Sequence, residues 1–122
     1  MNLSVLFVDD EVFNSTGMMQ YFRTFGFTNV AEVRTPLAAI DYIERNKPDL
    51  VFLDISLGER ETLTGVDVLR AVHVTTPETR IVMVSAYEQY QAEALAWGAY
   101  GYITKPCRPK VLLELAQKVA GS

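Results

Sequence analysis

Short apolar runs of strand length alternate along the chain with segments of helical period. The clearest runs cover residues 4–8, 50–54, 80–85 and about 100–104, and a weaker run covers Val30 to Val33. Because the runs are apolar at successive positions, they are typical of parallel strands that are covered on both faces. The segments between them repeat their apolar residues as amphipathic helices do. Five alternations of this kind predict an α/β fold.

Turn and capping residues support these boundaries. Thr35 and Pro36 are suited to the start of the second helix, and Pro109 to the start of the fifth, while Gly26 and Gly98 are suited to helix ends. Alternating strands and helices with right-handed crossovers form a doubly wound parallel sheet. With 122 residues, of which 49% are hydrophobic, we expect a single domain over residues 1–122.

Charged residues follow directly after three of the predicted strands. Asp9 and Asp10 follow the first, Asp54 ends the third, and Lys105 follows the fifth. Parallel strands place their carboxyl ends at one edge of the sheet, and ligands bind beyond that edge in doubly wound folds. Ser85, at the end of the fourth strand, is expected in the same crevice.

Three carboxylates in one crevice require a cation beyond a single lysine. At an effective dielectric constant of about 20, two carboxylates about 4 Å apart repel each other by about 4 kcal/mol. Mg²⁺ suits such a site best, because it accepts a few carboxylates and keeps waters that an incoming phosphate can replace; Mn²⁺ takes similar ligands. The pattern therefore predicts a site for a metal ion and a phosphoryl group.

Composition excludes several other classes of protein. A net charge of −4 argues against direct binding of nucleic acid, which requires clustered Lys and Arg. The single cysteine, Cys107, excludes an internal disulfide and favours a reducing compartment. No apolar run approaches the roughly 20 residues that span a bilayer. We expect no membrane contact and a cytoplasmic location.

The chain resembles the receiver domains of two-component response regulators over essentially its whole length. The residues that carry this resemblance are Asp9, Asp10, Glu11, Asp54, Ser85, Ala86, Tyr102, Lys105 and Pro106. The resemblance implies a flavodoxin-like (βα)5 fold with strand order 2-1-3-4-5. It also implies that Asp54 is the phosphoacceptor, forming an aspartyl phosphate.

The resemblance assigns the other site residues as well. Asp10 and Asp54 would bind Mg²⁺ directly, Asp9 would act partly through water, and the backbone carbonyl of Ser56 would complete the protein's ligands. Lys105 would pair with a phosphoryl oxygen.

Ser85 and Tyr102 would form the switch. The serine hydroxyl would move towards the phosphate and the tyrosine would turn inward behind it. The Lys105–Pro106 bond is a candidate cis peptide, because cis bonds occur essentially before proline.

The expected function is signal transduction. A histidine kinase or histidine phosphotransfer protein would donate the phosphoryl group, and the face formed by the fourth helix, fifth strand and fifth helix would control a downstream protein. Beyond self-phosphorylation from small donors and self-dephosphorylation, no enzyme activity is expected. Tyr100 and Gly101 replace an acidic pair typical of receivers that dimerise through that face. A monomer or weak dimer is therefore expected.

Two alternative functions remain open at this point. One is a receiver that docks partners without phosphate, and the other is a small phosphatase with an aspartate nucleophile. The segment from Ser56 to Thr64 is longer than usual in receivers, which leaves partner access and phosphate lifetime open. Tyr87, Tyr90 and Trp97 have helical spacing and either pack inward or form an exposed aromatic surface.

Overall fold

The computed structural model describes residues 2–10, 12–55 and 64–121, with only the backbone described for residues 12–15. The strands are β1 (Val5–Val8), β2 (Val30–Val33), β3 (Leu50–Asp54), β4 (Arg80–Ser85) and β5 (Gly101–Thr104). The α-helices are α1 (Val12–Thr24), α2 (Pro36–Asn46), α3 (Gly65–Thr75), α4 (Gln91–Ala96) and α5 (Pro109–Ala120), and a 3₁₀ turn, η1 (Glu88–Tyr90), precedes α4. None of the described helices is long and apolar enough to cross a membrane.

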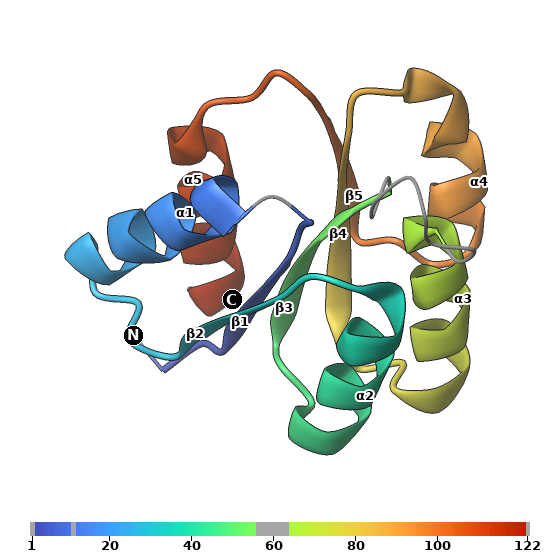
Figure 1. Ribbon diagram of the computed structural model, residues 1–122, viewed down its shortest axis with the longest axis horizontal. Coiled ribbons are helices and arrows are strands. Elements are labelled where there is room, and N and C mark those ends of the chain that lie inside the picture. Colours follow the sequence, from blue (N-terminus) through green and yellow to red (C-terminus); the bar gives the residue numbers. More distant parts are fainter. Residues whose placement is uncertain (1, 11, 56–63, 122) are drawn as a thin grey trace.

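The strands form one parallel sheet in the order β2-β1-β3-β4-β5. Helices α1 and α5 cover one face of this sheet, and α2, α3 and α4 cover the other (Figure 1). The predicted fold class and strand order are therefore confirmed. Helices cover both faces of the sheet, and this explains why the strands are apolar at successive positions, as inferred from the sequence.

The core divides into two halves on either side of the sheet. Leu6 and Val8 of β1 pack with α2, α3 and α4, whereas Val5 and Phe7 pack with α1 and α5. Successive strand residues point to opposite faces, so one short strand contributes to both halves. This arrangement leaves the ends of the strands, rather than their faces, available for a site.

Helix ends follow the predicted chemistry at most positions. The Thr35 hydroxyl accepts a hydrogen bond from the Ala38 N–H (3.2 Å), and Pro36 is the first residue of α2. Gly26 and Gly98 both have a φ of 93°, a backbone conformation that glycine adopts without steric cost. Lys47 is the C-cap of α2 and has a φ of 47°, a left-handed conformation that is uncommon for lysine and was not predicted from the sequence.

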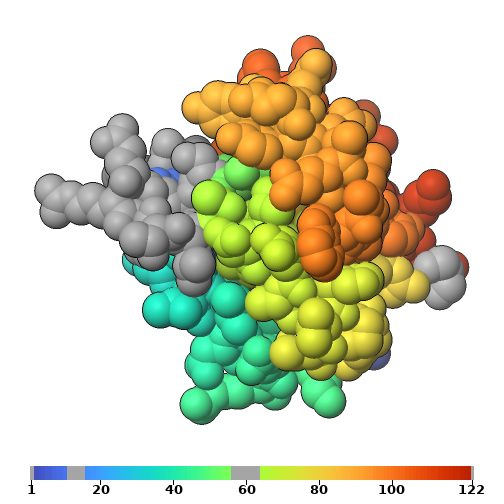
Figure 2. Space-filling view, turned by 90° about the vertical axis from the view of Figure 1, so that its right-hand side faces the viewer, coloured from blue at the N-terminus to red at the C-terminus, as the bar shows by residue number. Residues whose placement is uncertain are grey.

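The predicted fourth helix is shorter than its aromatic spacing indicates. Tyr87 precedes the η1 turn and contacts Tyr90 edge to face, with ring centroids 6.2 Å apart. Trp97 lies apart from this pair, under the Arg70 guanidinium at 4.7 Å, and packs against the core half beneath α3 and α4. Figure 2 shows α3 and α4 adjoining on this face. Of the two interpretations, inward packing thus describes Trp97, whereas Tyr87 is exposed.

Candidate functional site

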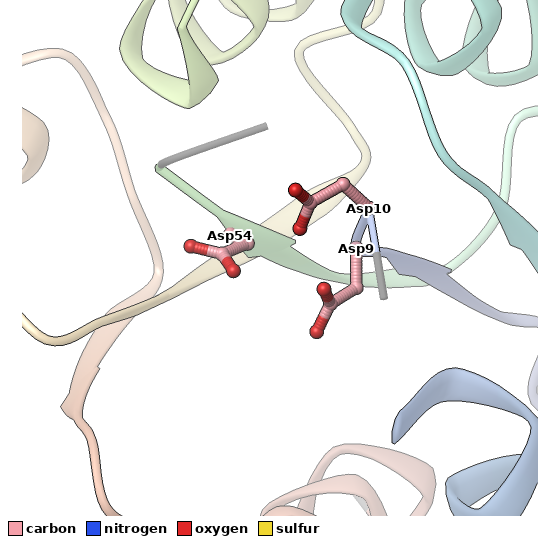
Figure 3. Close-up of side chains that lie close together, drawn as sticks. All are labelled: Asp9, Asp10 and Asp54. Atoms are coloured by element: carbon pink, nitrogen blue, oxygen red, sulfur yellow. The ribbon is translucent and has the colours of Figure 1, made fainter. Parts of the chain in front are cut away.

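The acidic residues lie together because their strands are neighbours in register. Val8 of β1 is paired with Leu53 of β3, so the next residues, Asp9 just after β1 and Asp54 at the end of β3, lie at the same edge of the sheet. Asp9, Asp10 and Asp54 each offer a carboxylate oxygen, and these oxygens all lie within 4.8 Å of one another (Figure 3). The structure thus brings together the three carboxylates predicted from the sequence.

Lys105 reaches this cluster from the edge of the sheet. Its ammonium donates a hydrogen bond to Asp54 Oδ2 at 2.8 Å and lies 4.0 Å from Asp9 Oδ2. Its backbone N–H donates to the Ser85 carbonyl (2.7 Å), which anchors the residue to β4, and the Lys105–Pro106 peptide is cis. Asp54 is only 9% exposed, and its charge is compensated by this direct ion pair, whose lysine side chain is one third exposed.

The donor set fits a hard divalent cation. All three side chains offer carboxylate oxygens, and these oxygens, within 4.8 Å of one another, are close enough to approach one ion together. Adjacent ligands of an octahedral Mg²⁺ lie about 3 Å apart, so binding would draw the three side chains closer. One lysine leaves this cluster with excess negative charge. Ser56, whose carbonyl is the remaining predicted ligand, lies outside the described residues.

The two predicted switch residues bind the backbone of a third residue, Tyr87. The Ser85 hydroxyl accepts a hydrogen bond from the Tyr87 N–H at 3.0 Å, and the Tyr102 hydroxyl donates to the Tyr87 carbonyl. Ser85 is 1% exposed and lies one residue beyond the Asp54–Val84 register pair. Tyr87 therefore joins the two switch residues, a role that its position in the sequence does not indicate.

Gly65 is a second residue to which sequence analysis assigned no structural role. Its N–H donates to the Ile55 carbonyl (2.8 Å), so the start of α3 lies against the end of β3. A Cβ at this position would lie 2.7 Å from the Ile55 Cα and in collision with the Asp54 carbonyl oxygen. The absent side chain allows α3 to begin directly behind Asp54, a close approach that only the folded arrangement reveals.

Comparisons with known proteins agree with this geometry. The family model described as the response regulator receiver domain matches residues 5–117. A chemotaxis protein CheY from Listeria monocytogenes is 32% identical over 120 residues, which cover 97% of this chain and 98% of the relative. A chemotaxis protein CheY from Thermotoga maritima is 29% identical, and the match covers 98% of this chain and 99% of that protein.

Solved structures show the same similarity. A CheY-like receiver domain protein from Methanospirillum hungatei superimposes with a TM-score of 0.86 at 27% identity, covering 98% of this chain and 96% of that one. The receiver domain of NtrX from Brucella abortus gives a TM-score of 0.84 at 27% identity, covering 98% and 99% of the two chains.

Proposed function

Because the chain belongs to the response regulator receiver domain family, we propose that Asp54 accepts a phosphoryl group and that residues 1–122 act as one phosphorylation-controlled switch. Membership places the chain among regulatory domains of two-component signalling. The observation that carries the finer proposal is the convergence of Asp9, Asp10, Asp54 and Lys105 at the carboxyl edge of the sheet.

The three carboxylates have different roles in this proposal. Asp54 is assigned as the nucleophile from its position in the family, at the end of the third strand, and Lys105 holds its carboxylate in place. Asp9 and Asp10 would bind Mg²⁺ or Mn²⁺ together with Asp54 and the Ser56 carbonyl. When bound, the metal neutralises charge on the phosphoryl oxygens, which is much of what phosphoryl transfer requires of a protein.

Lys105 has a place in both states of the site. Before phosphorylation its ammonium neutralises part of the Asp54 charge at 2.8 Å. Once Asp54 carries a phosphoryl group, the same ammonium is within reach of a phosphoryl oxygen, where a charge-assisted hydrogen bond is stronger than a neutral one. No large movement of β5 is needed for this exchange of partners.

The conformational readout would pass through Tyr87. A serine hydroxyl has one hydrogen to donate and two lone pairs that accept, so Ser85 can donate to a phosphoryl oxygen while it still accepts from the Tyr87 N–H. Movement of Ser85 towards the phosphate would then draw Tyr87 with it, and Tyr102 would follow through its bond to the Tyr87 carbonyl. The face formed by α4, β5 and α5 would change accordingly.

The phosphoryl donor and the target are proposed from family membership. A histidine kinase or histidine phosphotransfer protein would supply the phosphoryl group, and a downstream protein would bind the altered face. The protein would act as a regulatory phosphoacceptor, with turnover limited to its own phosphorylation and dephosphorylation.

A direct test uses a small phosphodonor. Incubation of the chain with Mg²⁺ and acetyl phosphate is expected to add one phosphoryl group, detected by intact mass and removed by hydroxylamine. Asp54→Asn should abolish the addition, because an amide is no nucleophile for phosphorus. Asp49→Asn is the matched control, since Asp49 binds Ser4 at the opposite end of β3. An unchanged mass of the native protein would refute the phosphoacceptor role.

A further inference from the structure

A cavity of about 820 Å³ adjoins the acidic site on the face of the sheet that α1 and α5 cover (Figure 1). Met18 lines it from α1, and Leu112 lines it from α5. The charged residues among its described lining are Asp9, Asp54 and Lys105, which belong to the acidic site. The cavity therefore has one charged end and an apolar body.

The charged end carries an excess of negative charge. Asp9, Asp10 and Asp54 supply three carboxylates, whose oxygens lie within 4.8 Å of one another, against the one ammonium of Lys105. The Lys105 ammonium lies 2.8 Å from Asp54 but 4.0 Å from Asp9, so the excess is greatest beside Asp9 and Asp10. This end of the cavity favours a cation and repels an anion.

Gly17 keeps the α1 side of the apolar body open. It lies inside a helix, where glycine is less favourable than alanine, and its φ is not in the left-handed region. A Cβ at Gly17 would meet no heavy atom within 4 Å, so close packing does not require the glycine either. This differs from Gly65, where a Cβ would collide with backbone. The consequence of Gly17 in the folded protein is unoccupied space beside Asp54.

The two parts of the cavity together define the ligand that would fill it. Pockets of roughly 300–1,000 Å³ with mostly apolar walls and a few polar groups are the kind that enclose small molecules. A hydrated Mg²⁺ matches only the charged end and leaves the apolar walls in contact with water. An organic ammonium matches both parts, because its head donates up to three hydrogen bonds to carboxylates and its alkyl chain removes apolar surface from water.

We propose that this cavity binds a small primary alkylammonium ion in place of the metal. The head group would lie between the Asp9 and Asp10 carboxylates, and the alkyl chain between α1 and α5. Because the head group and Mg²⁺ use the same oxygens, the two ligands exclude each other. The consequence for regulation rests on the proposed function: with the amine bound, Asp54 lacks the metal that phosphoryl transfer requires.

Ligand chain length and charge provide the first test, on the metal-free chain. Ethyl-, butyl- and hexylammonium carry the same charge at neutral pH and differ only in their apolar part. Their dissociation constants, measured by titration calorimetry, are expected to fall by up to about fourfold for each methylene group that enters the cavity. Hexanoate and hexanol should bind at least about tenfold more weakly than hexylammonium, because neither makes the charge-assisted hydrogen bonds. Equal constants for the three amines, or for hexylammonium and hexanol, would overturn the inference and leave the cavity for an apolar protein segment.

Competition with Mg²⁺ tests the position of the head group. With Mg²⁺ at about ten times its own dissociation constant, the apparent dissociation constant of hexylammonium should rise about elevenfold, as for two ligands of one site. Asp10→Asn should weaken all three amines by similar factors, because it removes charge at the head group and leaves the apolar walls intact. Asp41→Asn, at an exposed carboxylate on α2, is the matched control. An amine affinity that changes neither with Mg²⁺ nor in Asp10→Asn would contradict the shared site.

Two leucine variants of α1 test the position of the alkyl chain. Gly17→Leu is expected to bring the ratio between the hexylammonium and ethylammonium affinities close to one, because its side chain occupies the space of the alkyl chain. Gln20→Leu adds the same side chain at an exposed position of α1 outside the described lining, and it should keep the native ratio. A native ratio in Gly17→Leu would contradict the placement of the chain.

Cys107, which lines the cavity just before α5, reports binding without any phosphoryl transfer. It is the single cysteine, and burial raises the pKa of its thiol although the Lys105 charge opposes the rise, so its reaction is followed at mildly alkaline pH. Dithiodipyridine, a neutral disulfide that amines do not consume, is the reagent. Hexylammonium should slow its reaction with Cys107 severalfold, whereas ethylammonium, which has the same charge, should not. Equal rates with the two amines would overturn the inference.

Phosphorylation in the presence of the amine separates the two proposals. Hexylammonium should slow the addition of phosphate from acetyl phosphate, and further Mg²⁺ should restore the native rate. Chain-length-dependent binding of amines to a protein that no donor phosphorylates would refute the proposed function and retain the ligand class of the cavity. Phosphorylation that hexylammonium does not slow at any Mg²⁺ concentration would overturn the inference and leave the phosphoacceptor role of Asp54 standing.

Discussion

At the scale of single residues, the surroundings of Asp54 depend both on a charged side chain, that of Lys105, and on the absence of a side chain at Gly65. Lys105 supplies the compensating charge at 2.8 Å, while Gly65 supplies the space that lets α3 begin behind Asp54. The two residues lie forty positions apart in the chain. Lys105 binds the Asp54 carboxylate, whereas Gly65 lies against the Asp54 backbone carbonyl. Substitution at Gly65 therefore tests whether this close approach is required.

Gly65→Ala is expected to destabilise the protein by about 1–3 kcal/mol, because the added methyl group collides with backbone atoms that have no rotamer to adopt. Urea unfolding measures the effect. Gly17→Ala is the matched control and should stabilise the protein by up to about 1 kcal/mol, since it adds a better helix former in open space. Similar effects of the two substitutions would contradict the packing described for α3.

At the scale of secondary-structure elements, the connection from β4 to α4 is fixed by hydrogen bonds to the backbone of one residue, Tyr87. Ser85 of β4 and Tyr102 of β5 both bind the backbone of Tyr87, on its N–H and its carbonyl respectively. Two adjacent strands thus position the start of the η1 turn. A change at either strand should reach α4 through Tyr87.

Ser85→Ala is expected to speed hydrogen exchange of the Tyr87 amide by up to about tenfold, because a hydrogen bond of net strength near 1 kcal/mol is lost. Tyr102→Phe should speed it less, through loss of the bond to the Tyr87 carbonyl. NMR exchange rates at residue resolution provide the measurement. Tyr100→Phe is the control, because the Tyr100 ring lies over Arg80 instead. Equal rates in the two tyrosine variants would argue against the coupling.

At the scale of the whole molecule, the parallel sheet gathers charge at one end. The carboxyl edges of β1, β3 and β5 bring Asp9, Asp10, Asp54 and Lys105 together, and the resulting excess of negative charge opposes folding until a cation binds. Metal binding and global stability are therefore linked.

Mg²⁺ at about 100 times its dissociation constant should stabilise the fold by about 2.7 kcal/mol, which corresponds to a rise of roughly 10 °C in melting temperature. Asp10→Ala should remove most of this rise and, without metal, should leave the protein no less stable, because carboxylate repulsion is relieved. Thermal melts with and without Mg²⁺ measure both effects. Asp41→Ala, which changes an exposed carboxylate on α2, should keep the native response. An equal rise in Asp10→Ala would contradict its role as a metal ligand.

Much of the fold and of the acidic cluster is readable from the sequence. The order of strands and helices follows from local apolar periodicity, and the position of each charged residue directly after a strand places it at one edge of any parallel sheet. For this reason Asp9, Asp10, Asp54 and Lys105 were predicted to meet, and they do. Strand order came from the family resemblance, since local periodicity does not specify which strands pair.

Only the tertiary structure decided the features that depend on distances between remote segments. The link through Tyr87, the collision that excludes a side chain at Gly65 and the open space beside Gly17 all arise where separate elements approach one another. The position of Trp97 at the end of the short α4, under Arg70 of α3, is a contact of the same kind, which the helical spacing of the aromatic residues does not predict. The sequence by itself determined which groups stand at the sheet edge, and packing decided how they are held and what space lies beside them.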